Sequence, residues 1–119
     1  MNQLILDGHS LTIDQVISVA YDSNVKIQLS ESAKPQIQKA ADAVKAFVDN
    51  KSIVYGITTG FGAFKDRIIS PEHVNCLQQN ILVSHAVGVG DKLDLPTTKA
   101  MIVIRANTLT QGYSGIRLE

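Results

Sequence analysis

The sequence predicts a mostly α-helical fold with a small N-terminal β element, an α+β arrangement in a single domain over residues 1–119. Apolar residues recur with a period of about 3.6 along residues 33–49, 71–87 and 96–111, which indicates amphipathic helices. Period-two alternation is confined to residues 25–29. A chain of 119 residues can bury one sizeable core but not a second.

The N-terminal segment has the pattern of a strand, a helix and a second strand. Residues 4–6 form an apolar triplet before the turn dipeptide Asp7-Gly8, which is typical of a short strand that ends in a tight turn. Thr12 and Gln15 have the spacing of a capping box, so a helix begins there. The alternating residues 25–29 predict a half-buried strand that can pair with the first.

Residues 33–49 show the strongest helical pattern, and Pro35 limits where this helix can begin. An interior proline costs about 3 kcal/mol, whereas a proline in the first turn loses a hydrogen bond that was absent anyway. We therefore place the N-cap at Ser32, with Pro35 at the third helical position. Residues 50–52 end the helix, and residues 53–55 form an extended entry into the next loop.

Two further helices are predicted in the second half of the chain. Ser70 is the expected N-cap of the first, with Pro71 at its first helical position. We expect this helix to continue to about Val87, where the sequence Gly88-Val89-Gly90 stops it. The last helix runs from about Pro96 to Gln111, with Gly112 as its C′ residue.

The charge balance argues against nucleic acid and membranes as partners. The 11 basic and 11 acidic residues cancel, so the basic surface that supplies nonspecific nucleic-acid affinity is missing. Apolar runs fall far short of the roughly 20 residues that span a bilayer. The N-terminal sequence has no secretory leader, and Cys76 is the single cysteine, so we expect a cytoplasmic protein.

A glycine-rich loop is the first candidate site. Gly56, Gly60 and Gly62 lie within the seven residues that follow Tyr55, so the loop presents a phenol beside flexible backbone. The loop lacks the lysine and hydroxyl residue of a phosphate loop and the spacing of a dinucleotide fingerprint. A plain turn with a packed tyrosine is the simpler alternative.

His85 is the second candidate, beside Ser84 near the end of a predicted helix. A lone histidine on an apolar face is commonly a core residue, and the alternative is a hydrogen-bonding group at a pocket wall. His73 and Cys76 lie three positions apart, but two ligands do not make a zinc site. No metal site is predicted.

Five segments together resemble the aromatic amino acid ammonia-lyase family, which includes histidine, phenylalanine and tyrosine ammonia-lyases and related aminomutases. They are residues 55–62 (YGITTGFG), 77–85 (LQQNILVSH), 88–90 (GVG), 105–109 (RANTL) and 112–117 (GYSGIR). The resemblance covers essentially the whole chain. It corresponds to only the N-terminal portion of such an enzyme, so we expect a chain truncated at its C-terminal end.

The resemblance implies the fumarase-aspartase-like helical fold and the elimination of ammonia from an amino acid substrate by a homotetramer. Removing a weakly acidic β proton requires an electron sink. In the family that sink is methylidene-imidazolone, which forms autocatalytically from Ala-Ser-Gly. This tripeptide is absent here, and Tyr113-Ser114-Gly115 is no substitute. The resemblance implies that the chain alone is inactive.

Residue by residue, the resemblance implies that Tyr55 is the proton acceptor and that Gly56, Gly60 and Gly62 let its loop close. It also implies that Ser84 and His85 bind the substrate side chain.

A Ser-His pair is similar to that of histidine ammonia-lyases, so histidine degradation to urocanate is the leading prediction. Thr58 stands where these enzymes often have asparagine and resembles the phenylalanine and tyrosine branches. A tyrosine or phenylalanine lyase or aminomutase is one alternative. A non-catalytic assembly module is another.

Overall fold

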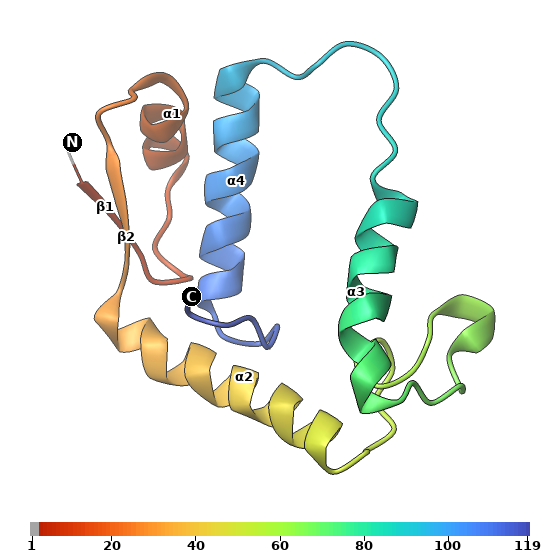
Figure 1. Cartoon of the computed structure of the whole chain (residues 1–119). Coiled ribbons are helices and arrows are strands. Elements are labelled where there is room, and N and C mark those ends of the chain that lie inside the picture. Colours follow the sequence, from red (N-terminus) through yellow and green to blue (C-terminus); the bar gives the residue numbers. More distant parts are fainter. Residues whose placement is uncertain (1–2) are drawn as a thin grey trace. The chain divides into compact units, whose positions relative to one another are not determined.

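The computed structural model describes residues 3–119, which contain four α-helices and two β-strands. The helices and strands, in chain order, are β1 (Gln3–Leu6), α1 (Ile13–Tyr21), β2 (Lys26–Leu29), α2 (Lys34–Asp49), α3 (Pro71–His85) and α4 (Leu95–Thr110) (Figure 1). The predicted mostly helical fold with a small N-terminal β element is confirmed. None of the helices in this described stretch is long and apolar enough to cross a membrane.

The chain divides into two compact units. Of the described residues, 3–41 and 91–119 form unit 1 and 42–90 form unit 2, so that α2 contributes its first half to one unit and its second half to the other. The N-terminal β element, α1 and α4 belong to unit 1. The glycine-rich loop and α3 belong to unit 2.

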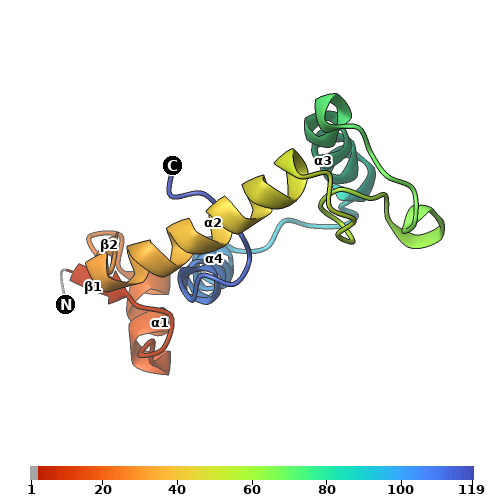
Figure 2. The same cartoon turned by 90° about the horizontal axis from the view of Figure 1, so that it is seen from below.

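Unit 1 is built on a parallel pair of strands, in which Gln3 lies opposite Lys26 and Leu6 opposite Leu29. The predicted pairing is therefore confirmed, with α1 as the connection between the strands. α1 packs along α4, and both lie beside the strands (Figures 1 and 2). Leu4, Leu6, Val19 and Val103 form a buried core cluster in this unit.

Local sequence signals explain how α1 begins. The Gln15 amide donates to Thr12 Oγ1 at 3.3 Å, and the Thr12 amide donates to Gln15 Oε1 at 2.9 Å, so the predicted capping box is present. β2 is less buried than its alternation predicts, because Ile27 keeps 45% of its surface exposed. The sheet has two strands among the described residues, so neither strand is covered by neighbours on both edges.

Polar side chains of α4 hold the first turn of unit 1 in place. Asn107 Oδ1 accepts a hydrogen bond from the Gly8 amide at 3.0 Å, and Gln111 Nε2 donates to the Gly8 carbonyl oxygen at 2.8 Å. Gly112 has a φ of +74°, as its predicted C′ position requires. These bonds connect the N-terminal turn with the end of α4.

The predicted start of α2 is wrong. Ser30, not Ser32, is the N-cap, and it begins a 3₁₀ turn over residues 31–33. The Lys34 amide donates to the Glu31 carbonyl oxygen, which satisfies an amide that the helix itself could not pair. The Ser32 hydroxyl lies 2.8 Å from that of Ser30 instead of capping the helix. The α-helix therefore begins at Lys34, and Pro35 is its second residue.

The predicted end of α3 is also wrong, because the helix stops at His85 and does not reach Val87. Ala86 has φ −75° and ψ 64°, and the Val87 amide donates to the His85 carbonyl oxygen at 2.8 Å. These are the angles and the hydrogen bond of an inverse γ-turn. The turn ends the helix before Gly88, so glycine is not needed for the stop.

α2 ends in a Schellman motif whose C′ residue is a lysine. The Lys51 amide donates to the Val48 carbonyl oxygen at 3.1 Å, and the Ser52 amide donates to the Phe47 carbonyl oxygen at 2.9 Å. Lys51 has a φ of 52°, which a side chain with a Cβ adopts at a cost of about 1–2 kcal/mol. Among the described non-glycine residues, Lys51 is the one with positive φ.

We expect Lys51→Gly to stabilise the chain by about 0.5–1 kcal/mol, because the relief of strain exceeds the added entropy of the unfolded chain. Urea denaturation measures the free energy of unfolding. Asn50→Gly is the control, since Asn50 is not in the positive-φ region and glycine there should destabilise. Equal losses for both variants would contradict the strain at Lys51.

Candidate functional site

Tyr55 lies at the start of the glycine-rich loop in unit 2, with 63% of its surface exposed. Its ring contacts Phe61 edge to face, with 5.7 Å between the ring centroids and 68° between the ring planes. Such a contact orients an aromatic ring without covering its hydroxyl. The phenol is therefore accessible for chemistry.

The glycines of the loop serve different physical needs. Gly56 has a φ of 73°, and a Cβ there would lie 3.1 Å from Phe61 Cε1. Gly62 has a φ of 55° in open space. Gly60 is buried, and a Cβ there would lie 2.6 Å from Phe64 Cβ and 2.8 Å from the Phe64 carbonyl oxygen. Gly60 thus permits the close approach of Phe64, whereas Gly56 and Gly62 permit a positive φ that residues with a Cβ rarely adopt.

We expect Gly60→Ala to lower the free energy of unfolding by about 1–3 kcal/mol, because the added methyl group must displace backbone as well as side-chain atoms of Phe64. Gly88→Ala is the matched control, since a Cβ at Gly88 meets nothing within 4 Å. Urea denaturation of both variants tests the difference. Similar stability of the two variants would show that the Gly60 contact is not tight.

Two buried threonines in the loop were not predicted as functional residues. Thr58 Oγ1 accepts from the Val54 amide at 2.9 Å and donates to the Ser52 carbonyl oxygen. Thr59 Oγ1 accepts from the Gly56 amide at 3.3 Å and donates to the Gly60 carbonyl oxygen at 3.0 Å. Both hydroxyls are thus used to hold the loop backbone. Threonine hydroxyls can bond to nearby backbone, but residue type alone does not indicate that these two do so.

Ser84 and His85 form a hydrogen-bonded pair at the end of α3. His85 Nδ1 lies 3.0 Å from Ser84 Oγ and 3.0 Å from the Ile81 carbonyl oxygen, to which Ser84 Oγ also donates at 3.0 Å. Because a carbonyl oxygen only accepts, we assign the ring hydrogen of neutral His85 to Nδ1. Nε2 is then a hydrogen-bond acceptor. Both residues are exposed.

α3 connects the two candidate sites within unit 2. Gln78 Nε2 donates to the Gly56 carbonyl oxygen at 3.4 Å, so the helix that ends in His85 also contacts the residue after Tyr55. Among the described residues, no hydrogen bond or ring contact joins Tyr55 to Ser84 or His85. Both sites are therefore linked to α3, without a direct hydrogen bond or ring contact between them.

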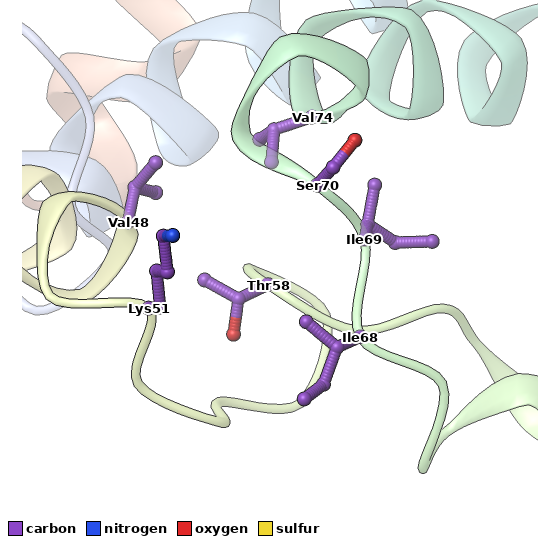
Figure 3. A pocket seen from close by; sticks show the side chains of 7 residues that line it. All are labelled: Val48, Lys51, Thr58, Ile68, Ile69, Ser70 and Val74. Atoms are coloured by element: carbon purple, nitrogen blue, oxygen red, sulfur yellow. The ribbon is translucent and has the colours of Figure 1, made fainter.

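A cavity of about 270 Å³ lies behind the loop in unit 2 (Figure 3). It is lined by Val48, Lys51, Thr58, Ile68, Ile69, Ser70 and Val74. The lining is mostly aliphatic and includes neither Tyr55 nor His85. The cavity therefore contacts the loop at Thr58 and does not connect the two candidate sites.

His73 and Cys76 do not form a metal site in this structure. Ser70 Oγ lies 2.9 Å from His73 Nδ1, whereas Cys76 is a free, exposed thiol that accepts from Asn80 Nδ2 at 3.5 Å. Across residues 3–119, no group of three or more histidine, cysteine, aspartate or glutamate side chains could hold a metal ion.

Residues 11–119 match the profile of the family described as "Aromatic amino acid lyase". The chain belongs to the aromatic amino acid lyase family. It is 53% identical over 121 residues to a histidine ammonia-lyase from Chloroflexus aurantiacus, a match that covers 100% of this chain and 23% of the relative.

Solved structures of this family share the fold. Histidine ammonia-lyase from Trypanosoma cruzi matches with a TM-score of 0.89 and 37% identity, over 98% of this chain and 22% of that structure. Tyrosine aminomutase from Streptomyces globisporus matches with a TM-score of 0.89 and 27% identity, over 97% of this chain and 22% of that structure. The chain thus spans about a quarter of the length of these lyases and aminomutases.

Proposed function

We propose that the chain is the N-terminal domain, residues 1–119, of a histidine ammonia-lyase, which converts L-histidine to urocanate and ammonia in histidine degradation. The observation that carries this proposal is the Ser84–His85 pair, with Nε2 of His85 as a hydrogen-bond acceptor, in a chain that is 53% identical to a histidine ammonia-lyase. The same pair would not favour a substrate with a purely apolar ring.

In this reaction the β-carbon loses a proton, the amino group leaves from the α-carbon as ammonia, and a carbon–carbon double bond forms. We assign the proton to the Tyr55 oxygen, which accepts it as the phenolate and thereby becomes the phenol, since this side chain is exposed beside the loop. His85 Nε2 accepts a hydrogen bond from a substrate imidazole N–H, because its Nδ1 is engaged by the Ile81 carbonyl oxygen. Tyr55 thus acts on the reacting carbon, and His85 holds the side chain.

The methylidene-imidazolone of the family does not fit the residues of this chain. It forms from Ala-Ser-Gly, and the sequence contains no such tripeptide; residues 113–115 are Tyr-Ser-Gly. We therefore derive no step through this group and propose that it comes from sequence outside these residues. The chain alone is then expected to be inactive.

We also propose that the complete enzyme is a cytoplasmic homotetramer, as the family resemblance implies. The free, exposed thiol of Cys76 supports a reducing compartment. Many apolar side chains of α3 and α4 are exposed in the chain by itself, among them Leu82, Val83 and Ile102. Exposed apolar area on this scale supports packing against further protein.

Two other functions remain as alternatives. Thr58 and the structural match to tyrosine aminomutase favour a tyrosine or phenylalanine enzyme. The phenol of a tyrosine substrate would also donate to His85 Nε2, whereas phenylalanine has no such donor. A non-catalytic assembly module would keep the domain without the reaction.

The downstream coding sequence and an absorbance assay distinguish these functions. An Ala-Ser-Gly within the continuing reading frame, followed by urocanate formation from histidine by the extended protein, would support the proposal. Coumarate or a β-amino acid from tyrosine would support the first alternative. A stop codon directly after Glu119 would support the assembly module.

A further inference from the structure

Side chains of two other residues hold both backbone polar groups of Gly56, the residue after Tyr55. Thr59 Oγ1 accepts from the Gly56 amide at 3.3 Å, and Gln78 Nε2 donates to the Gly56 carbonyl oxygen at 3.4 Å. Gly56 itself has a φ of 73° and no side chain with which to anchor itself. The peptide groups on either side of Gly56 are therefore held by the side chains of other residues.

Thr59 is firmly anchored. Its side chain is fully buried, with 0% of its surface exposed, and its hydroxyl also donates to the Gly60 carbonyl oxygen at 3.0 Å. Thr59 forms an antiparallel bridge with Ile68, and the Gly60 amide donates to the Arg67 carbonyl oxygen at 3.1 Å. The threonine that holds Gly56 is thus tied to the segment that leads into α3.

Gln78 lies on α3, so its contact comes from the same part of unit 2. The two contacts on Gly56 therefore both depend on the segment formed by residues 67–69 and α3. The Tyr55 ring adds the edge-to-face contact with Phe61. A tyrosine oxygen lies far from its own Cα, so a small backbone rotation displaces it considerably. A misplacement of about 1 Å at a reacting group can cost roughly 10²-fold in rate.

We propose that Thr59 and Gln78 are positioning residues for Tyr55, which hold Gly56 at its amide and its carbonyl and thereby fix the place of the phenol oxygen. The inference rests on the proposed function, because it takes Tyr55 as the proton acceptor. Neither residue is assigned a contact with substrate. Their effect should therefore appear in kcat and not in KM.

The experiment uses the full-length enzyme with L-histidine as substrate and compares Thr59→Val with Thr59→Ser. Valine keeps the shape and removes both hydrogen bonds, whereas serine keeps the hydroxyl. We expect kcat per folded active site to fall roughly 10–100-fold in Thr59→Val, with KM nearly unchanged, and to be largely restored in Thr59→Ser. A purely structural role would reduce the amount of folded enzyme and leave kcat per folded site unchanged.

Thr110→Val is the matched control for losing a buried threonine hydroxyl. Thr110 is 5% exposed and donates to the Ala106 carbonyl oxygen at 2.8 Å within α4. We expect this variant to keep the kcat of the unmodified enzyme. An equal loss of kcat in Thr59→Val and Thr110→Val would overturn the inference, because the effect would then not be specific to the loop.

Gln78→Leu keeps the test decisive if Thr59→Val does not fold, since Gln78 is exposed and its replacement should not unfold the chain. We expect a fall in kcat of roughly 3–10-fold, as befits the loss of one neutral hydrogen bond. An unchanged kcat in Gln78→Leu, together with a Thr59→Val enzyme whose kcat is unchanged or cannot be measured, would overturn the inference.

Tyr55→Phe distinguishes a failure of the positioning role from a failure of the proposed role of Tyr55. If Tyr55→Phe is inactive while the Thr59 and Gln78 variants are fully active, the proposed positioning role is wrong and the proposed role of Tyr55 stands. If Tyr55→Phe is fully active, the proposed role of Tyr55 is wrong.

Discussion

Tyr55→Phe should lower kcat of the full-length enzyme roughly 10²–10⁴-fold, the range that a positioned acid or base contributes. The substitution removes the hydroxyl and keeps the ring, so the edge-to-face contact with Phe61 is preserved. Because Tyr55 is 63% exposed, we expect almost no loss of stability. KM for histidine should change little, since in the proposed mechanism the phenol acts on the β proton and does not bind the imidazole. The formation of urocanate, followed by absorbance, measures both constants.

Tyr21→Phe provides the matched control for this loss. Tyr21 lies at the end of α1 and is 76% exposed, so its hydroxyl is removed from a similarly solvated position outside the loop. Its kcat should equal that of the unmodified enzyme. A Tyr55→Phe enzyme that turns over as fast as Tyr21→Phe would show that another group accepts the proton.

Much of the fold could be predicted because its signals are local. The Thr12 and Gln15 side chains form the capping box that their spacing indicates, and Gly112 takes the positive φ that a C′ residue needs. The ends of α2 and α3 could not be predicted in this way. A 3₁₀ turn at Ser30 and an inverse γ-turn at Ala86 decide them, and each depends on one or two backbone hydrogen bonds of about 1 kcal/mol net.

The same distinction between what the local sequence indicates and what depends on the backbone path applies to the candidate site. Tyr55 and His85 were predicted from a resemblance that rests on contiguous motifs, and their roles stay predictions. The contacts of Thr59 and Gln78 with Gly56 could not be predicted, because they depend on the path of a loop backbone. Residue type alone does not indicate whether a threonine hydroxyl bonds its own loop or points to solvent.

His85→Leu should lower kcat/KM for histidine roughly 5–150-fold, which corresponds to about 1–3 kcal/mol for a buried donor left without a partner. In the proposed binding mode the substrate imidazole N–H meets Nε2, which is an acceptor because the Ile81 carbonyl oxygen engages Nδ1 at 3.0 Å. Leucine offers no acceptor. Phenylalanine has no polar group on its ring, so its turnover should not fall, and the ratio of phenylalanine to histidine turnover should rise.

Two further variants test whether the acceptor, and not the bulk of the ring, selects the substrate. His85→Gln places an amide oxygen at the same position of the helix and should restore part of the turnover of histidine. His73→Leu makes the same chemical change on the same helix, where the histidine lies 2.9 Å from Ser70 Oγ, and should leave the substrate ratio unchanged. If His85→Leu kept the histidine preference of the unmodified enzyme, the imidazole would have to be recognised by residues outside this chain, and the Ser84–His85 pair would be left without a part in specificity.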